Sequence, residues 1–472
     1  MQIHVIKRND TLWNIAERYG SDYRQIAVLN QLNNPNILVI GQALVIPDPR
    51  REYVVQSGDT LWMIAQRYQI PVQEIAAVNQ ITDPNLLFVG QMLEIPYYPY
   101  IVQLGDSLWE IAQQTGVTVN ELMRMNAITN PSLIYPGQVL KIPQPSRPVK
   151  EINAYATKTG AQGAQEILAY GRLLTYVTPF TYSIRSDGTI TELNDLPILE
   201  AAEATNVLPL LVLTNFVEGD FDSDLAATLL RSPELQEKLI TILLEEMQEK
   251  GYQGVNFDFE YVYPEDRENY NNFLRRVVAR LHPNGYLVTT ALAPKIRSDQ
   301  EGLLYEAHDY KTQGEIVDFI VLMTYEWGWA GGRPLAIAPI NEVRKVLDYA
   351  ITVIPRDKIM MGIPLYGRDW KIPWQEGTVA RTVSSQEAIQ LAATYGAEIQ
   401  YNDTYQSPYF RYTAGDGQQH EVWFEDARSI QAKYDTLRDY DIRGASYWVL
   451  GIPFPQNWAV LQNNFIVKKG DV

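Results

Sequence analysis

A sequence pattern that occurs three times in the first third of the chain constrains the fold more than any other feature. The strings NDTLW, GDTLW and GDSLW contain Asp10, Asp59 and Asp106. In each copy an Asn follows that Asp by 20 residues, a Gly by 31 and a Pro by 37. Self-similarity at a fixed internal spacing indicates a tandem array of three similar modules.

Each copy has the pattern of a strand, two helices and a strand. The runs HVIK, YVVQ and YIVQ alternate as short strands do, and ALVIP, MLEIP and VLKIP close the copies. Thr11, Thr60 and Ser107 stand where a helix N-cap is expected, because a hydroxyl accepts a free backbone N–H there. Apolar residues from Leu12 to Tyr19 then recur at i, i+3, i+4 and i+7, which predicts one apolar helical face. The predicted modules span residues 2–48, 52–97 and 99–144.

These copies resemble LysM modules, which bind N-acetylglucosamine-containing glycans such as peptidoglycan and chitin. The resemblance implies a groove between the first strand–helix loop and the loop before the last strand. The matching positions are Asp10, Thr11, Leu12, Asn36 and Ile37 in the first copy, Asp59, Thr60, Leu61, Asn85 and Leu86 in the second, and Asp106, Ser107, Leu108, Ser132 and Leu133 in the third. For the Asp, hydroxyl and Leu positions, helix capping and core packing stay open as the alternative. Three weak sites in tandem favour an insoluble polymer over a free sugar.

The charge of the chain narrows the classes of partner. Lys plus Arg number 39 and Asp plus Glu 56, so the formal charge is 39 − 56 = −17. Nucleic-acid binding needs clustered cations, so we expect no nucleic-acid partner and no attraction to anionic lipid. No apolar run reaches about 18 residues, so we expect no membrane insertion. The start, MQIHVIKRND, lacks the apolar core of a signal peptide.

Residue types also limit the chemistry. The chain has no Cys and four His, which excludes a disulfide framework, a thiolate metal site and a cysteine nucleophile, and argues against a histidine-rich metal site. We expect no metal ion and no organic cofactor. We also expect a monomer.

After a linker at 145–149, apolar runs alternate with helical stretches. The strand-like runs are EINAYA, LTYVTPF, VLPLLVLTNF, GVNFDFEYV, YLVTTALAP, VDFIVLMTYEW, IMMGIPLYG and GASYWVLG. Eight such units predict an α/β fold, a (β/α)8 barrel, over residues 150–472. Residues from about 370 to 440 are rich in Tyr, Trp and Gly and predict a small inserted α+β subdomain between strands 7 and 8.

The fourth run carries the candidate chemistry. Asn256, Asp258 and Glu260 are two residues apart, so they share one face of the strand. Asp258 and Glu260 are about 6.7 Å apart along the backbone. Active sites of such barrels lie at the carboxyl ends of the strands, and two stacked carboxylates there raise one pKa toward neutrality. Paired carboxylates among aromatic residues are typical of glycosidic cleavage. The alternative is a structural carboxylate pair inside the barrel.

This segment resembles glycoside hydrolase family 18, whose fourth-strand signature is D-x-x-D-x-D-x-E. The signature matches at Asp258 and Glu260 and departs at Gln253 and Asn256. Met323-Thr324-Tyr325 matches the sixth-strand M-x-Y, the run from Gly362 to Arg368 matches G-x-P-x-Y-G-R, and Trp448 stands on the eighth strand. The insertion resembles the chitinase insertion domain of that family.

The resemblance implies a substrate-assisted, retaining mechanism without an enzymic nucleophile. Glu260 is then the proton donor, Asp258 orients the 2-acetamido group, Tyr325 binds its oxygen, and Asn256 bonds Asp258. The implied substrate contacts are Trp448, Tyr366, Arg368, Glu326, Tyr155 and Asn215. Packing or structural hydrogen bonding stays open for Tyr325, Trp448, Tyr366 and Arg368, and most strongly for Tyr155 and Asn215.

Two departures distinguish the chain from ordinary chitinases. Thr214-Asn215-Phe216 replaces S-x-G-G at the third strand, and Glu326 replaces an Asp. With the LysM modules and the absent signal, the chain is similar to the spore-cortex-lytic N-acetylglucosaminidases of endospore-forming bacteria. That similarity implies cleavage of peptidoglycan after N-acetylglucosamine, in the coat and cortex region of the spore during germination. The alternatives are a LysM chitinase, secreted or associated with the cell wall, and a non-catalytic glycan-binding lectin.

Overall fold

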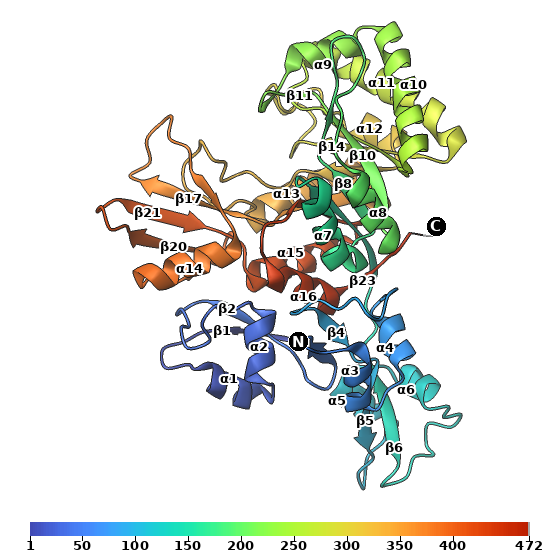
Figure 1. Ribbon diagram of the computed structural model, residues 1–472, viewed down its shortest axis with the longest axis vertical. Coiled ribbons are helices and arrows are strands. Elements are labelled where there is room, and N and C mark those ends of the chain that lie inside the picture. The colour runs from blue at the N-terminus through green and yellow to red at the C-terminus, as the bar shows by residue number, and fades with distance from the viewer. Residues whose placement is uncertain (471–472) are drawn as a thin grey trace. The chain divides into compact units, whose positions relative to one another are not determined.

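Eight parallel strands form a closed barrel in the second part of the chain (Figure 1). The computed structural model describes residues 1–470, so the last two residues of the predicted barrel domain, 471 and 472, lie outside the described residues. In chain order the strands are β7 Val149–Ala156, β8 Tyr176–Pro179, β10 Leu208–Thr214, β13 Gly254–Asp258, β14 Leu287–Leu292, β15 Phe319–Leu322, β16 Ile359–Pro364 and β22 Gly444–Leu450. Pairing of β10 with β13 and of β22 with β7 closes the sheet. Each predicted strand is present, and the predicted barrel is confirmed.

The helices that follow these strands bury one apolar face each, because the barrel surface is apolar. In α10, Ser232 caps the first turn and Pro233 opens the helix, while Gly251 ends it with φ 79°, a left-handed conformation that glycine adopts without a Cβ clash. The helices are α7 Gly160–Tyr170, α8 Leu196–Ala204, α9 Ser223–Leu230, α10 Pro233–Lys250, α11 Arg267–Leu281, α12 Tyr310–Ile316, α13 Ile340–Val353 and α15 Ala427–Tyr440. Three short strands, β9 Tyr182–Ser183, β11 Phe216–Val217 and β12 Asp220–Phe221, lie in the loops, and β23 Ile466–Val467 follows near the end.

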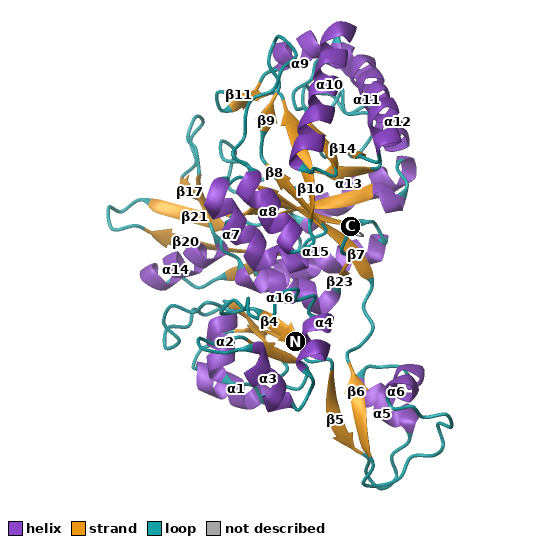
Figure 2. Ribbon diagram, turned by 45° about the vertical axis from the view of Figure 1, so that its right-hand side comes forward, coloured by secondary structure: helices purple, strands orange, loops and turns teal. Residues whose placement is uncertain are grey.

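The inserted segment after β16 is a five-stranded antiparallel sheet with one helix (Figure 2). Its elements are β17 Gly367–Ile372, β18 Arg381–Val383, α14 Ser385–Tyr395, β19 Gln400–Asn402, β20 Ser407–Thr413 and β21 Gln419–Trp423. The sheet therefore starts and ends earlier than the predicted range of 370–440. Helix α15, inside that range, contacts α13 through the Arg344–Asp439 ion pair of 2.7 Å and belongs to the barrel helices.

Each repeat forms a βααβ module. The bounds are β1 Gln2–Val5, α1 Leu12–Tyr19, α2 Tyr23–Leu29 and β2 Ala43–Ile46; β3 Glu52–Val54, α3 Leu61–Tyr68, α4 Val72–Val78 and β4 Met92–Glu94; and β5 Tyr97–Ile101, α5 Leu108–Thr115, α6 Val119–Met125 and β6 Val139–Pro143. Thr11, Thr60 and Ser107 accept the backbone N–H three residues on, as the sequence predicts. Asn9 takes φ 70° where the other copies have Gly58 and Gly105 at 88° and 98°, so its loop keeps the same left-handed turn.

The last helix of the chain, α16 Pro455–Asn464, does not group with the barrel. The described chain divides into two compact units, one of residues 1–149 with 455–466 and the other of residues 150–454 with 467–470. Within the first unit α16 contacts α2 and β2. The predicted division at residue 150 placed this helix in the barrel domain.

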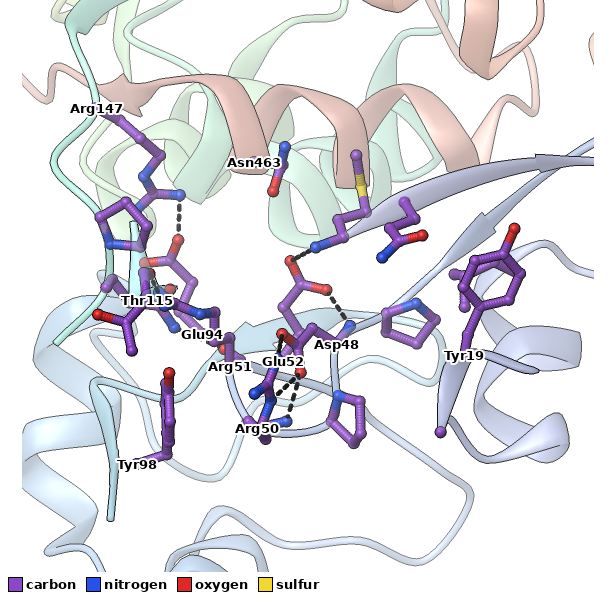
Figure 3. A pocket seen from close by; sticks show the side chains of 18 of the residues that line it. Tyr19, Asp48, Arg50, Arg51, Glu52, Glu94, Tyr98, Thr115, Arg147 and Asn463 are labelled. Carbon is purple, nitrogen blue, oxygen red and sulfur yellow. Dashed lines mark hydrogen bonds and ion pairs between the residues drawn. The ribbon is translucent and has the colours of Figure 1, made fainter. Parts of the chain in front are cut away.

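The three modules and α16 surround a cavity of about 660 Å³ (Figure 3). Most of its charged side chains are paired with another charge, and Arg51 donates to the backbone carbonyls of Thr115 and Pro143. Arg50 Nη2 lies 3.0 Å from Asp48 Oδ2, and Arg147 pairs with Glu94. Because these charges neutralise one another, we interpret the cavity as a junction between the modules. Across residues 1–470, no helix combines the length and the apolar character needed to cross a membrane.

Candidate active site

Asp258 is the last residue of β13, and Glu260 follows two residues later at the barrel mouth. Phe257 and Phe259 point to the other face and are fully buried against Phe273 of α11, with ring centroids 5.3 and 6.3 Å away. This alternation turns both carboxyl groups to the interior of the barrel. The predicted shared face is therefore present in the structure.

The environment of the two carboxyl groups favours their neutral forms. Burial raises the pKa of Asp258 to about 7. Burial raises the pKa of Glu260 well above its usual value, and the nearby Asp258 and Glu326 raise it further. Atom Oδ1 of Asp258 is buried and has no protein hydrogen-bond partner. Such a site holds a proton near neutral pH and leaves an acceptor free for a ligand N–H group.

Two residues that lie far away in sequence hold the backbone beneath the carboxylates. Asn215 accepts the N–H of Glu260 at 3.1 Å and donates to its carbonyl at 2.9 Å. His308 accepts the N–H of Ala293 at Nδ1, so its Nε2–H donates to the Phe259 carbonyl at 2.9 Å. Burial lowers the pKa of His308 to about 4, which keeps this ring neutral. Asn215 is fully buried, which differs from its predicted place in the mouth.

Asn256 does not bond Asp258 as the sequence comparison implied. Its Oδ1 accepts the hydroxyl of Tyr155 at 2.9 Å, and its Nδ2 donates to Thr289 at 2.8 Å. Tyr155 is 2% exposed and packs beside Trp448, with ring centroids 5.4 Å apart. Tyr155 is therefore a buried support under Trp448 and not a wall of the open mouth.

Tyr325 follows β15 and lies against β16 because Gly362 leaves room for its ring. A Cβ at Gly362 would lie 2.7 Å from Tyr325 Cε1. Burial raises the pKa of the Tyr325 hydroxyl well above its usual value, so this group stays a hydrogen-bond donor. Next to it, Glu326 accepts Arg368 Nη2 at 2.7 Å and the Tyr366 hydroxyl. The structure thus brings together the four residues predicted at the ends of the sixth and seventh barrel strands, which are Tyr325, Glu326, Tyr366 and Arg368.

Aromatic residues that the sequence reading passed over continue the wall beside Trp448. Phe180 meets Trp448 edge-on at a centroid distance of 5.0 Å. Phe216 lies 6.2 Å from Phe180 and 5.1 Å from Phe221, all after the ends of strands β8 and β10. The signal in the sequence that could have identified these residues is their position just after the ends of predicted strands. The insertion aromatics mostly pack together, with Tyr409 stacked on Trp423 at 4.5 Å.

The side chains in this mouth are suited to proton transfer and sugar contact. Among residues 1–470, no three His, Asp or Glu side chains gather in a way that would hold a metal ion. A family model for glycosyl hydrolases family 18 matches residues 177–451. The chain belongs to glycosyl hydrolases family 18. LysM domain models match residues 4–47, 53–96 and 100–143, so both family resemblances are confirmed. The chain is a glycosidase of this family.

Two relatives and one solved structure are similar to this chain over two thirds or more of its length. The chain is similar to the cortical fragment-lytic enzyme of Bacillus subtilis (strain 168), at 44% identity over 99% of both chains. The Bacillus anthracis enzyme of the same name is 47% identical over 69% of this chain and 74% of its own length. The crystal structure of the Bacillus cereus spore cortex-lytic enzyme SleL matches with a TM-score of 0.77 and 39% identity, covering 99% of this chain and 98% of that one.

In the LysM modules of this family-18 hydrolase, some of the predicted glycan-contact residues are buried and others are exposed. Leu12, Leu61 and Leu108 are at most 4% exposed and belong to the module cores. The Asp side chains turn inward, as Asp59 does in accepting Gln56 N–H and the Tyr53 hydroxyl at 2.8 Å each. The remaining predicted contacts are exposed: Thr11, Asn36, Ile37, Thr60, Asn85, Leu86, Ser107, Ser132 and Leu133. LysM domains indicate association with a glycan of the cell wall.

Proposed function

We propose that this hydrolase cleaves spore-cortex peptidoglycan after N-acetylglucosamine and that its LysM modules hold it on the wall during germination. The observation that carries the proposal is the Asp258–Glu260 pair at the barrel mouth, in which Asp258 is buried and one of its oxygens has no protein partner. The names of the relatives, cortical fragment-lytic enzyme and spore cortex-lytic enzyme, support cortex as the substrate.

In the proposed reaction Glu260 protonates the glycosidic oxygen, which its raised pKa allows near neutral pH. The oxygen of the substrate's own 2-acetamido group attacks C1, and the leaving sugar departs. Asp258 accepts the acetamido N–H with its free oxygen and stabilises the positive charge of the cyclic intermediate. Glu260 then takes a proton from water, which opens the intermediate with net retention of configuration.

Other residues shape the sugar site in this proposal. Tyr325 donates its hydroxyl to the acetamido oxygen and holds it near C1. Trp448 lies under the sugar ring, supported by Tyr155 and Phe180. Glu326, held by Arg368 and Tyr366, faces the same space as a further acceptor. The acetamido requirement restricts the sugar before the cut bond to an N-acetylated one.

The test is a digest of purified spore-cortex peptidoglycan by the native chain and by Glu260→Gln, followed by borohydride reduction and mass spectrometry. We expect fragments that end in reduced N-acetylglucosamine with the native chain and none with Glu260→Gln. Glu237→Gln on the exposed face of α10 is the matched control and should give native products.

Fragments that end in reduced N-acetylmuramic acid would contradict the proposed bond. Absence of any new reducing end, with chitin oligosaccharides cleaved instead, would make the chain a LysM chitinase. Localisation is tested separately, with an antibody to the chain on sectioned spores, where we expect label over coat and cortex.

A further inference from the structure

Each LysM module exposes one tryptophan at the same position of its first helix. Trp13, Trp62 and Trp109 are the second residues of α1, α3 and α5 and are 62%, 63% and 64% exposed. A packed tryptophan buries about 150–250 Å². Rings left this open contribute little to the module cores, so folding does not explain why all three copies carry them.

The other side chains common to the three copies have structural partners. The Leu, Ile and Ala of each first helix are buried. Asn30 bonds the backbone of β2 at Val45 in both directions at 2.8 Å, and the Asn of each other copy does the same to β4 and β6. Gln42 and its counterparts accept a backbone N–H, and the shared loop prolines restrict the backbone. The tryptophans are shared side chains without such a role.

Neighbouring positions on the same helices differ from copy to copy. The residue after the tryptophan is Asn14, Met63 or Glu110, and the residue four positions after it is Glu17, Gln66 or Gln113. Positions that contribute only to helix capping or solubility vary in this way. The tryptophan alone stays fixed on this part of the surface, which indicates a contact with something outside the module.

We propose that Trp13, Trp62 and Trp109 stack on the apolar faces of N-acetylated sugar rings and so extend the glycan contact of each module. This inference rests on the proposed function and deepens its targeting step. The tryptophan lies two residues after the exposed cap Thr11, Thr60 or Ser107, at the loop where the glycan groove is predicted.

A sugar polymer suits this arrangement better than a protein partner. The side chain is neutral and flat, as a sugar face requires, and it occurs once per module on three modules of the same kind. A glycan presents the same ring again and again, so each module meets the same ligand. In the first module Tyr23 supports the ring from one side, with centroids 5.8 Å apart, and this limits the entropy lost on stacking.

The test measures binding of the full-length chain to insoluble spore-cortex peptidoglycan by co-sedimentation, with Glu260→Gln in every variant so that the wall stays uncut. Changing Trp13, Trp62 and Trp109 together to Ala should weaken apparent affinity by about 100-fold, because three linked contacts are lost at once. Trp→Phe at the same positions keeps a ring and should recover part of the affinity. Glu17→Ala, Gln66→Ala and Gln113→Ala, combined on the same helices, form the matched control and should bind as the parent does, because these side chains are exposed.

Circular dichroism and thermal unfolding should be unchanged in all of these variants, because the replaced side chains are exposed. Parent-like sedimentation of the triple Trp→Ala chain would overturn the inference. So would an equal loss in the control chain, or a parent that does not sediment with the wall. Failure of the proposed function is detected separately, in the digest with the native chain, which keeps Glu260. Fragments that end in reduced N-acetylglucosamine would then be missing.

Discussion

The Asp258–Glu260 pair holds a catalytic proton, and holding it lowers the stability of the fold as the pH rises. Because the folded-state pKa of Glu260 is raised, the folded chain holds a proton that the unfolded chain releases between acidic and neutral pH. Stability from this group is therefore complete below its unfolded pKa and is lost as pH rises through the folded value. The chain tolerates this loss where its chemistry needs an acid.

Glu260→Gln should consequently stabilise the fold at pH 8 by about 1–2 kcal/mol and should have little effect at pH 4.5. Thermal unfolding of the two chains at both pH values measures the difference. Glu237→Gln, on an exposed surface, should shift neither curve. A variant that is less stable than the native chain at pH 8 would contradict the raised pKa.

Asn215 is a positioning residue, because its side chain holds only backbone groups, those of Glu260 and Asp222. Asn215→Ala should lower kcat by about 10- to 100-fold with a small change in KM, since the carboxylate loses its alignment while the sugar contacts remain. Steady-state kinetics on soluble cortex fragments test this. Asn272→Ala on the exposed face of α11 serves as the control, and a change in KM alone would argue for direct sugar contact.

Single residues show where sequence reasoning was sufficient. The i, i+2, i+4 spacing predicted that Asp258 and Glu260 share a face, because strand geometry alone decides it. The backbone supports Asn215 and His308 were not predictable as such, since their bonds join segments 45 and 49 residues apart. For the same reason the partners of Asn256 differ from the expectation.

Strands β15 and β16 approach each other closely at the site, and this approach depends on one glycine. A Cβ at Gly362 would lie 2.5 Å from the Leu322 carbonyl and 2.7 Å from Tyr325. Gly362→Ala should therefore destabilise the chain by about 1–3 kcal/mol and reduce activity by displacing Tyr325.

Thermal unfolding and kinetics on the same preparation test both effects of Gly362→Ala. Gly415→Ala is the matched control, because a Cβ there meets nothing within 4 Å. Native stability of the Gly362→Ala chain would show that the strands separate at little cost.

At the scale of elements, the apolar runs predicted every barrel strand. The bounds of the inserted sheet, by contrast, depend on pairing between β17 and β21, which local sequence patterns do not encode.

At the scale of the whole molecule, the modules cannot be removed without affecting another part of the chain. Helix α16 is buried along most of its length and groups with residues 1–149. A chain that starts at residue 150 should expose part of this helix, including positions near Leu461, and lose about 1–3 kcal/mol of stability.

The expected result for the shortened chain is a melting temperature several degrees lower and increased binding of a hydrophobic dye, measured against the full chain. A full chain with the module-surface change Gln113→Ala is the control and should melt as the native chain does, because that side chain is exposed. Equal melting temperatures without dye binding would show that α16 needs no cover from the modules. The sequence predicted modules and barrel correctly but not this grouping, because it joins the two ends of the chain.

The grouping of α16 with the modules also sets an order of events during synthesis. The N-terminal part of the unit, through Val149, leaves the ribosome first, and Pro455 follows 455 − 149 = 306 residues later. At about 5–20 residues per second this interval lasts about 15–60 s. During that time the modules have formed, yet the face that receives α16 stays open. The N-terminal unit is thus the first to begin folding and among the last to finish.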